Sequence, residues 1–286
     1  MTAIIYSFFR MTRRLGLLSL ATFLPALLYA QPPADNQPVK ALTTSASGAL
    51  VVLRDNGLVV IESGVSTPIQ LPTTSEEARP SSLTKGADGN VYLAGLGLGV
   101  WRYNSAGNRW QSLNDTLPDL GVTAIAAHAT QPDTLYAYYP DLGMFRSRDG
   151  GAEWVNVDNG PQEPVQAFLH SDMPGSMESG WLFAGTTRGV SRSMDCFCFW
   201  GDAGDLQGKV SAISYDPAAP ENVYAVVDGA VYHSADGGEA WAPLKVIVPE
   251  TVTALVFSQT QGLVVGTADG KLLALNGTNE WTRVND

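Results

Sequence analysis

Short apolar runs, many of them alternating with polar residues, follow one another from residue 39 to residue 286. Turn segments rich in Gly, Asn, Asp and Pro separate these runs. Runs of this length with a period of two are typical of β-strands. No apolar spacing of three to four residues, which would indicate a helix, competes with this pattern. The sequence therefore predicts an all-β chain of short strands joined by tight turns.

The strands are organised in repeats. Five tryptophans mark the period, with spacings of 44, 46, 41 and 40 residues: Trp110, Trp154, Trp200, Trp241 and Trp281. A second marker recurs in phase with them, a Val that begins the runs VTAI, VQAF, VSAI and VTAL at 122, 165, 210 and 252. An apolar run that ends in a Gly turn completes each unit, so each repeat contains four short strands. Repeats of this length and content are typical of the blades of a β-propeller.

The number of repeats predicts a six-bladed ring. A single four-stranded sheet cannot bury both of its faces, so each blade must pack on two neighbours. We expect one all-β propeller of four-stranded antiparallel blades; a seven-bladed ring is the less favoured alternative, because residues 31–40 are too few to supply another blade. The six blades are predicted at 39–75, 81–118, 121–160, 164–206, 209–247 and 251–286.

The N-terminal region has a different pattern. Arg13 and Arg14 precede an apolar run from Leu15 to Leu28, and Ala30 is followed by a polar, Pro-rich stretch. This is the pattern of a secretory signal peptide, and the run is short for a membrane span. We expect a signal peptide at 1–30, a flexible lead-in at 31–38 and the propeller at 39–286. The prediction is an exported protein, periplasmic or extracellular, without a membrane span after cleavage; a retained anchor is the alternative.

The charge of the chain narrows its partners. It contains 17 Lys+Arg and 28 Asp+Glu, a formal net charge of -11. Residues 1–30 hold three arginines and no acid, so the remainder is more acidic still, with 14 basic against 28 acidic residues. An anionic surface repels phosphate backbones and anionic lipid. We therefore expect neither nucleic acid nor a membrane surface as a partner.

Three repeats share a pattern at the turn between their third and fourth strands. A Ser and an Asp two residues later are followed by a Trp, and two of the copies have a Gly pair after the Asp. The Asp can accept backbone N–H groups of the turn, the Gly pair allows positive φ, and the Trp can pack between blades. We assign a structural role to this set: Ser147, Asp149, Gly151, Trp154, Ser193, Asp195, Trp200, Ser234, Asp236, Gly238 and Trp241.

These segments resemble Asp boxes, the S-x-D-x-G-x-T-W signature of BNR-repeat β-propellers. That family includes sialidases, xyloglucanases, sortilin-type receptors and photosystem II assembly factor propellers. The chain departs from the signature at its Thr, which is replaced by Glu153, Phe199 and Ala240. The resemblance implies that the boxes hold the fold together on the rim, remote from the ligand-binding face. Because one fold hosts many functions, it does not by itself identify an activity.

The catalytic residues of a sialidase are not recognisable in the sequence. There is no Arg-Ile-Pro segment, and three arginines fall at one recurring strand position, which indicates a role in building blades: Arg102, Arg146 and Arg192. Four acids occupy turns between second and third strands, where Asp suits the turn geometry: Asp55, Asp141, Asp228 and Asp269. If the four acids instead line one mouth of the ring, glycosidase chemistry with two carboxylates stays open, and so does binding of Ca²⁺ or a cationic ligand. We expect a protein that is not an enzyme.

Blade four holds an unusual constellation. Its first loop is long, and its Asp-box turn contains both cysteines of the chain, so a four-stranded meander brings six side chains to one end: His170, Met173, Met177, Met194, Cys196 and Cys198. One hypothesis is a Cys196–Cys198 disulfide, which an oxidising compartment permits. Another is a site for Cu(I) or a related soft metal, made of thiolates and thioethers. Free, packed thiols are the third, and no other cofactor is predicted.

The same turn is a candidate docking surface. Aromatic side chains exposed on a rim hairpin would indicate a protein-binding patch, here made of Cys196, Phe197, Cys198 and Phe199. The function predicted from the sequence is an exported, monomeric, non-enzymatic β-propeller that acts as a protein-binding or assembly platform. The alternatives are a sialidase-like glycoside hydrolase or glycan-binding module, and a soft-metal or redox accessory protein acting through blade four.

Overall fold

The computed structural model describes residues 37–72, 77–105, 107–197 and 199–284. The chain divides into two compact units, Met1–Pro32 and Pro33–Asp286, and every described residue belongs to the second. The predicted signal peptide and most of the lead-in therefore lie outside the described residues. Within the described ranges, no helix is long and apolar enough to cross a membrane.

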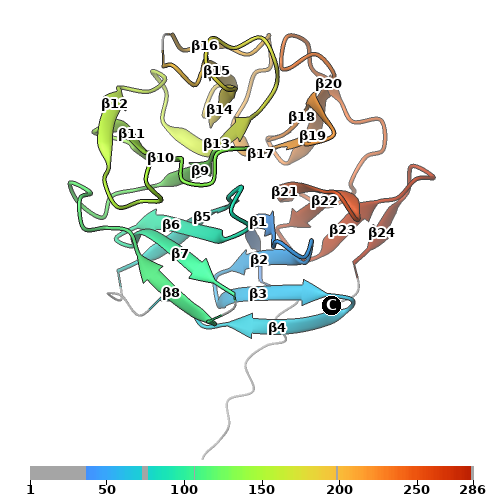
Figure 1. Ribbon diagram of the computed structural model, residues 1–286. Helices are drawn as coiled ribbons and strands as arrows, with labels where there is room; N and C mark the ends of the chain where they lie inside the picture. The colour runs from blue at the N-terminus through green and yellow to red at the C-terminus, as the bar shows by residue number, and fades with distance from the viewer. Residues whose placement is uncertain (1–36, 73–76, 106, 198, 285–286) are drawn as a thin grey trace, which may run out of the picture. The chain divides into compact units, whose positions relative to one another are not determined.

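The described residues form six antiparallel sheets of four strands, arranged as blades in a ring (Figure 1). The described part of the chain contains strands and turns but no helix, which confirms the six-bladed all-β propeller. Blades one to three comprise β1 (Val39–Thr44), β2 (Leu50–Arg54), β3 (Gly57–Glu62), β4 (Val65–Ile69); β5 (Arg79–Lys85), β6 (Val91–Leu96), β7 (Gly99–Asn104), β8 (Arg109–Ser112); and β9 (Ala124–Ala127), β10 (Leu135–Tyr139), β11 (Gly143–Ser147), β12 (Val155–Asp158). Blades four to six comprise β13 (Val165–Ser171), β14 (Trp181–Thr186), β15 (Val190–Met194), β16 (Gly201–Asp202); β17 (Val210–Asp216), β18 (Ala219–Val227), β19 (Ala230–Ser234), β20 (Ala242–Pro243); and β21 (Val252–Ser258), β22 (Gly262–Thr267), β23 (Leu272–Leu275), β24 (Trp281–Arg283).

The core lies between the blades. The buried hydrophobic side chains form six clusters, and each cluster is shared by two neighbouring blades. Successive side chains of a strand point to opposite faces of its sheet. In β10, Leu135 and Ala137 accordingly pack toward blade two, whereas Tyr136 and Tyr138 pack toward blade four. This explains why the second strands are continuously apolar, since both of their faces are covered.

The ring closes by packing between the first and last blades, which share no strand. The first strand of each blade contacts that of the next, and β21 meets β1. Val39 packs against the cluster that contains Val264 of blade six. The Thr253 hydroxyl donates to the Val39 carbonyl at 2.7 Å, and Arg54 Nη1 donates to the Gly270 carbonyl at 2.7 Å. Side-chain packing and a few hydrogen bonds therefore hold the first and last blades together.

The repeat tryptophans tie each blade to the one before it. Four of them donate the indole N–H to a backbone carbonyl of the preceding blade: Trp110 to Gln70, Trp154 to Leu113, Trp241 to Ala203 and Trp281 to Val246, at 2.8–3.0 Å. Trp200 differs, because it donates to a carboxylate oxygen of Asp158 at 2.8 Å. The period seen in the sequence is thus a period of contacts between blades.

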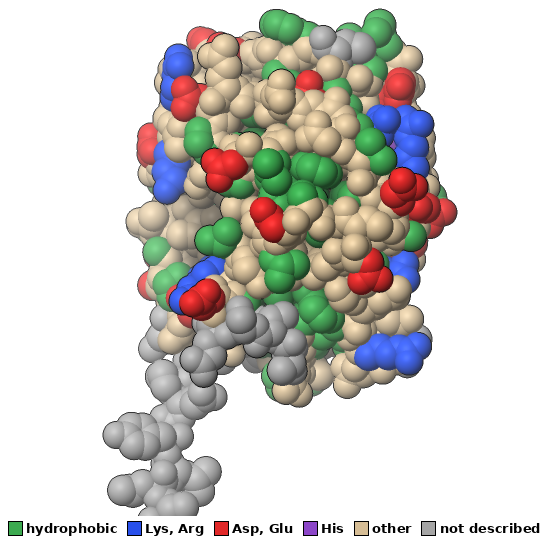
Figure 2. All heavy atoms as spheres, turned by 90° about the vertical axis from the view of Figure 1, so that its left-hand side faces the viewer, with side chains coloured by type: hydrophobic (Ala, Val, Ile, Leu, Met, Phe, Trp, Pro, Cys, Tyr) green, Lys and Arg blue, Asp and Glu red, His purple; other side chains and the backbone are tan. Residues whose placement is uncertain are grey.

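The surface carries charges of both signs. On the face shown in Figure 2, the left-hand side of Figure 1, acidic and basic side chains are scattered and hydrophobic side chains gather near the middle. Several ion pairs lie at exposed positions, including Lys40 with Asp55 and Arg148 with Glu178. Such exposed pairs contribute little to stability, so the fold depends on the interfaces between blades.

These contacts predict unequal costs for removing the tryptophans. Trp154 is 5% exposed, whereas Trp110 makes the same type of bond from a partly exposed position. Trp154→Ala should lower the free energy of unfolding by about 3–5 kcal/mol, as for other buried aromatic residues. Trp110→Ala should cost less. Urea unfolding followed by circular dichroism measures both; equal losses would contradict the assignment of the core to the interfaces.

Candidate functional site

The Asp-box turns of blades three and five share one hydrogen-bond pattern. In blade three the Ser147 hydroxyl donates to Asp149 Oδ1 at 2.8 Å and accepts the N–H of Gly151 at 2.8 Å. Asp149 Oδ1 also accepts the N–H groups of Ala152 and Glu153 at 3.1 and 2.9 Å. These bonds, the one from Glu153 foremost, lower the pKa of Asp149. Blade five repeats the arrangement through Ser234, Asp236, Gly238, Glu239 and Ala240.

The corresponding turn of blade four is built differently. Cys196 and Phe197 occupy the positions of the glycine pair, and Phe197 has a φ of 57°, in the left-handed region that disfavours a bulky side chain. The Ser193 hydroxyl donates to the Met194 carbonyl instead of to an Asp. The carboxylate of Asp195 does not bind its own turn. It points into the interface between blades three and four, where it is 1% exposed.

A buried polar cluster surrounds this carboxylate. Asp195 Oδ2 accepts the hydroxyl of Ser179 at 2.6 Å and lies 3.4 Å from Nε2 of His170 and 3.6 Å from Nε2 of His128. Nε2 of His128 also lies 2.8 Å from the Ser179 hydroxyl. The imidazole rings of His128 and His170 stack with centroids 3.8 Å apart, and Tyr136 stacks on His170 at 5.7 Å. His128 and His170 are 1% and 2% exposed.

The backbone fixes the proton positions of both imidazoles. Nδ1 of His128 accepts the N–H groups of Thr130 and Gln131, each at 3.1 Å, and Nδ1 of His170 accepts the N–H of Ala129 at 3.1 Å. A neutral imidazole that accepts at Nδ1 carries its proton on Nε2. Each Nε2 is therefore a donor, directed at the Ser179 hydroxyl or the Asp195 carboxylate.

This proton arrangement bears on metal binding. Nitrogen and carboxylate oxygen atoms of His128, His170 and Asp195 lie within 4.8 Å of one another, as in a ligand set. A histidine binds a metal through a nitrogen lone pair. Here the Nδ1 lone pairs face backbone N–H groups, and each Nε2 carries a proton. The cluster is therefore organised as a hydrogen-bonded anion with two imidazole rings.

The environment of the cluster also shifts the pKa of two side chains, His128 and Asp195. Burial, followed by the proximity of His170, lowers the pKa of His128 to about 4. Burial opposes ionisation of Asp195, but the hydrogen bonds from His170 and Ser179 outweigh it and hold the pKa of that carboxyl below its usual range. Near neutral pH, His128 is neutral and Asp195 is ionised. Arg146 supplies a cation to the same interface, with Nη1 3.5 Å from the backbone oxygen of Asp195.

The structure separates most members of the predicted soft-metal set. His170 faces blade three, whereas Met173 is 9% exposed and packs toward Gly237 of blade five. Met177 is 70% exposed, and Met194 is half-buried at the end of β15. Cys196 is disulfide-bonded. Cys198 lies outside the described residues, so its pairing with Cys196, and a soft-metal site that would use it, stay predictions.

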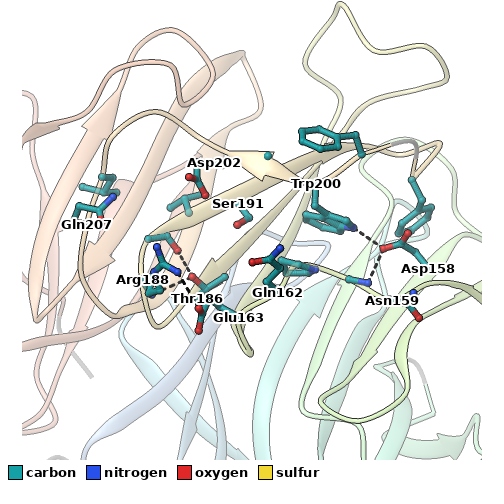
Figure 3. A pocket seen from close by; sticks show the side chains of 18 residues that line it. Asp158, Asn159, Gln162, Glu163, Thr186, Arg188, Ser191, Trp200, Asp202 and Gln207 are labelled. Carbon is teal, nitrogen blue, oxygen red and sulfur yellow. Dashed lines mark hydrogen bonds and ion pairs between the residues drawn. The ribbon is translucent and has the colours of Figure 1, made fainter.

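A pocket of about 530 Å³ opens along the same interface (Figure 3). Its walls come from the segment 158–163 that joins blades three and four, from the β14–β15 turn and from β15, β16 and residues 206–207. Phe197, Phe199 and Trp200 line it, so the candidate docking turn forms one of its borders. Phe199 is 76% exposed, whereas the half-buried Phe197 contacts Tyr136 at 5.8 Å between centroids.

Hydrogen bonds preset several polar side chains of this pocket. Asp158 Oδ1 accepts the indole N–H of Trp200 at 2.8 Å and the N–H of Gly160 at 2.6 Å. Glu163 forms an ion pair with Arg188 at 3.2 Å. Figure 3 shows Asp158 beside Trp200 and the Glu163–Arg188 pair at a distance from them, with Asp202 near Ser191. The remaining polar side chains are amides and hydroxyls: Asn159, Gln162, Thr186, Ser191 and Gln207.

Few acidic side chains line the central channel and its mouth in the described part of the chain. A cavity of about 60 Å³ lies among the first strands, and its described lining includes Lys40 but no Asp or Glu. At the mouth formed by the first turns, the one acid among the described lining residues is Asp88. Its carboxylate accepts the Tyr92 hydroxyl at 2.8 Å and the Asn90 amide at 2.5 Å. Asp55 lies in the β2–β3 turn, as predicted, and forms an ion pair with Lys40.

The recurring arginines do not converge on one ligand site. Arg146 reaches the backbone of Asp195 in blade four, and Arg192 donates to the Gly237 carbonyl in blade five at 2.7 Å. Arg102 donates to Gln111 within its own blade. These contacts accord with their shared repeat position on the third strands.

The sequence pattern does not reveal the buried cluster. It places Asp195 among the Asp-box residues, and it singles out His170 but not His128. A signal was nevertheless present: counted from Val122 and Val165, His128 and His170 fall at adjacent positions of the repeat, in consecutive blades. Side chains at adjacent strand positions point to opposite faces, so these two meet at the shared interface. The long loop of blade four then supplies Ser179.

Comparison with known proteins gives a fold and one short sequence match. No family model matches the chain. A xyloglucanase of Paenibacillus sp is 27% identical over 121 residues, which are 35% of this chain and 12% of the xyloglucanase. The match thus spans about an eighth of that enzyme.

Solved structures that resemble most of the propeller include the following three. The Niastella koreensis GH74 enzyme has a TM-score of 0.57 at 12% identity and covers 87% of this chain and 53% of its own. The extracellular domain of BT4673 from B. thetaiotaomicron gives 0.58 at 14%, with 88% and 34% coverage. YCF48 bound to D1 peptide gives 0.56 at 14%, with 85% and 94%. The chain spans about half of the GH74 enzyme, and at these identities the likeness establishes the β-propeller fold.

The buried cluster predicts a loss of stability in mild acid. The pKa of His128 is about 4 in the folded protein and 6.5 in its ordinary state, so between these values the unfolded chain binds a proton that the folded protein does not. The stability conferred by the neutral ring is present above pH 6.5 and is lost as the pH falls toward 4. The expected loss is about 3 kcal/mol at most. Asp195, with its lowered pKa, adds a further loss at lower pH.

Urea unfolding between pH 7 and pH 4 measures this loss. His128→Asn keeps an acceptor near the Nδ1 position but cannot be protonated, so it should be less stable at pH 7 and lose less stability in acid. Burial also lowers the pKa of His233, which bonds to Asn222 in blade five, so His233→Asn measures how much a histidine outside the cluster contributes to the pH profile. An unchanged pH profile in His128→Asn would exclude the cluster as the source.

Proposed function

We propose that this chain is an exported, non-enzymatic β-propeller that binds a segment of another protein in the pocket between blades three and four. The observation that carries the proposal is the exposed aromatic border of that pocket, with Phe199 76% exposed beside Trp200. Aromatic side chains are enriched at the centres of protein interfaces, and a contiguous exposed apolar patch beside a pocket is typical of an interaction site.

The pocket is supported by rigid elements. Trp200 is oriented by its bond to Asp158, and Phe197 packs on Tyr136, which stacks on His170 of the buried cluster. A border fixed in this way loses little side-chain entropy when a ligand binds. The buried polar cluster between blades three and four therefore supports binding by preorganising the turn that carries Phe199.

The placement of the carboxylates favours binding over hydrolysis. Glycoside hydrolysis needs two carboxyl groups that face one reacting bond in a cleft. The central channel has no acid among its described lining residues, and Asp195 is buried within hydrogen bonds. In the pocket, Asp158 and Glu163 are engaged by Trp200 and Arg188, which leaves Asp202 as the one acid of the described lining without such a partner. These groups position neighbouring side chains and are not arranged as an acid and a base.

Export is part of the same proposal. It is supported by the signal-like pattern of residues 1–30 and by the extracellular location of the BT4673 domain, a structural neighbour. A disulfide at Cys196 accords with an oxidising compartment.

A second candidate is glycan binding in the same pocket. Trp200 and Phe199 offer aromatic faces, and Asn159, Gln162 and Gln207 offer amide groups, a combination that also suits a neutral sugar. The short match to a xyloglucanase adds weight to this alternative.

Partner capture with matched variants tests the proposed function. The chain is affinity-purified from its export compartment after chemical cross-linking, as the parent, as Phe199→Ser and as Ile247→Ser. Ile247 is 81% exposed and does not line the pocket, so it controls for a general loss of exposed hydrophobic surface. One defined protein should be captured by the parent and by Ile247→Ser, and at most weakly by Phe199→Ser.

The same preparations are assayed for release of reducing ends from xyloglucan, and for binding of xyloglucan oligosaccharides. We expect no release. Hydrolysis abolished by replacing a pocket carboxylate, or oligosaccharide binding lost in Phe199→Ser without a captured protein, would reject the proposal in favour of the glycan alternatives.

A further inference from the structure

We infer that the pocket between blades three and four selects a cationic segment, in which an Arg or Lys side chain enters between Trp200 and the pocket carboxylates. The inference rests on the proposed function and specifies the chemistry of the partner. Three observations carry it: the charge of the lining, the aromatic wall, and the spread of the acids along the pocket.

The lining carries excess negative charge. Asp158, Glu163 and Asp202 are acidic, and Arg188 is the one basic residue among the described lining residues. Arg188 is already paired with Glu163, and its side chain is 72% exposed, directed to solvent rather than sequestered. Asp202 is exposed and makes no side-chain hydrogen bond or ion pair within the described part of the chain. A site with two negative charges in excess attracts cations and repels anionic partners.

The aromatic wall suits the same ligand. Among aromatic side chains, Trp attracts a cation above its ring most strongly, and Arg is the most frequent cation in such contacts. Trp200 offers such a ring in the pocket. The molecule already uses this chemistry twice, with Arg192 5.1 Å from the Trp181 ring and Arg146 5.8 Å from the Phe197 ring. An incoming guanidinium can rest on Trp200 while its N–H groups bond to a carboxylate.

The spread of the acids argues against a metal ion and for an extended ligand. The described residues contain one group of three side chains close enough to share a metal ion, His128, His170 and Asp195. The pocket acids are not such a group. A volume of about 530 Å³ is within the range typical of small-ligand sites. It can hold one or two side chains of an extended segment.

The net negative charge of the chain also favours a basic partner. Residues 31–286 carry twice as many acidic as basic residues, so the surrounding field favours approach of a basic segment. Electrostatic attraction of this kind raises the association rate and weakens as salt screens it.

Peptide binding tests the inference. The probe is a labelled, capped hexapeptide, Gly-Ser-Arg-Arg-Ser-Gly, and its neutral analogue has Gln in place of each Arg. Fluorescence anisotropy with the full chain gives the affinity at about 25 mM and about 300 mM NaCl, which brackets the range over which screening acts. At low salt the Arg peptide should bind about tenfold or more tightly than the Gln peptide, and the difference should shrink at high salt.

Charge variants locate the site. Asp202→Lys should weaken the Arg peptide about tenfold, and Asp202→Asn should weaken it about threefold. The control is Glu280→Gln, which removes one exposed charge from blade six, outside the pocket lining. It should change the affinity less than twofold, because this charge lies two blades away from blade four and salt screens it. Circular dichroism and the melting temperature verify that each variant is folded.

The outcomes separate this inference from the proposed function. Equal affinity for the Arg and Gln peptides, or an affinity unchanged in Asp202→Lys, overturns the cationic selection. Phe199-dependent capture of a protein would then still stand, with a partner of different chemistry. Binding of a neutral xyloglucan oligosaccharide in place of either peptide, blocked in Phe199→Ser, overturns both.

Discussion

The constraint on which the whole structure depends is that no blade can bury both faces of its own sheet. Each blade is a single sheet of four short strands, and its apolar side chains alternate between the two interfaces on its faces. Stability therefore belongs to pairs of blades, and the ring must close to remove the last exposed faces. The contact of Val39 with blade six, and the bonds of Thr253 and Arg54, complete that closure without a shared strand. Every local feature of the molecule is placed by these six interfaces.

One interface differs from the rest. Between blades three and four, part of the core is a buried carboxylate with two imidazole rings and a hydroxyl. A buried charge is costly unless its hydrogen bonds are satisfied. Here Ser179 and His170 supply them, and backbone N–H groups hold both rings in the donating tautomer. The cluster thus couples the charge of a few side chains to the contact between two blades.

The same interface supports the binding pocket. The carboxylate of Asp195 bonds to His170 and Ser179 and not to its own turn. Cys196 and Phe197 replace the glycine pair in that turn. Its positive φ is an unfavourable backbone conformation for Phe197. The ring of Phe197 nevertheless contacts Tyr136 and lies under the guanidinium group of Arg146. Phe199 is left exposed at the border of the pocket. In blade four, the absence of the Asp-box bonds that blades three and five make is therefore accompanied by an exposed aromatic residue at the border of the pocket.

The sequence by itself determined the all-β class and the six blades of four strands, because period-two alternation and a repeat of 40–46 residues are local properties of the chain. It also located blade four as the exception, through the long loop and the absent glycines. Only the tertiary structure decided which polar residues meet. His128 and Asp195 lie 67 positions apart, and they approach because neighbouring blades present opposite faces to one interface. The pocket depends on the same pairing, since Asp158 and Trp200 come from different blades. A repeat pattern specifies what each blade contains, whereas the closure of the ring specifies which side chains face one another.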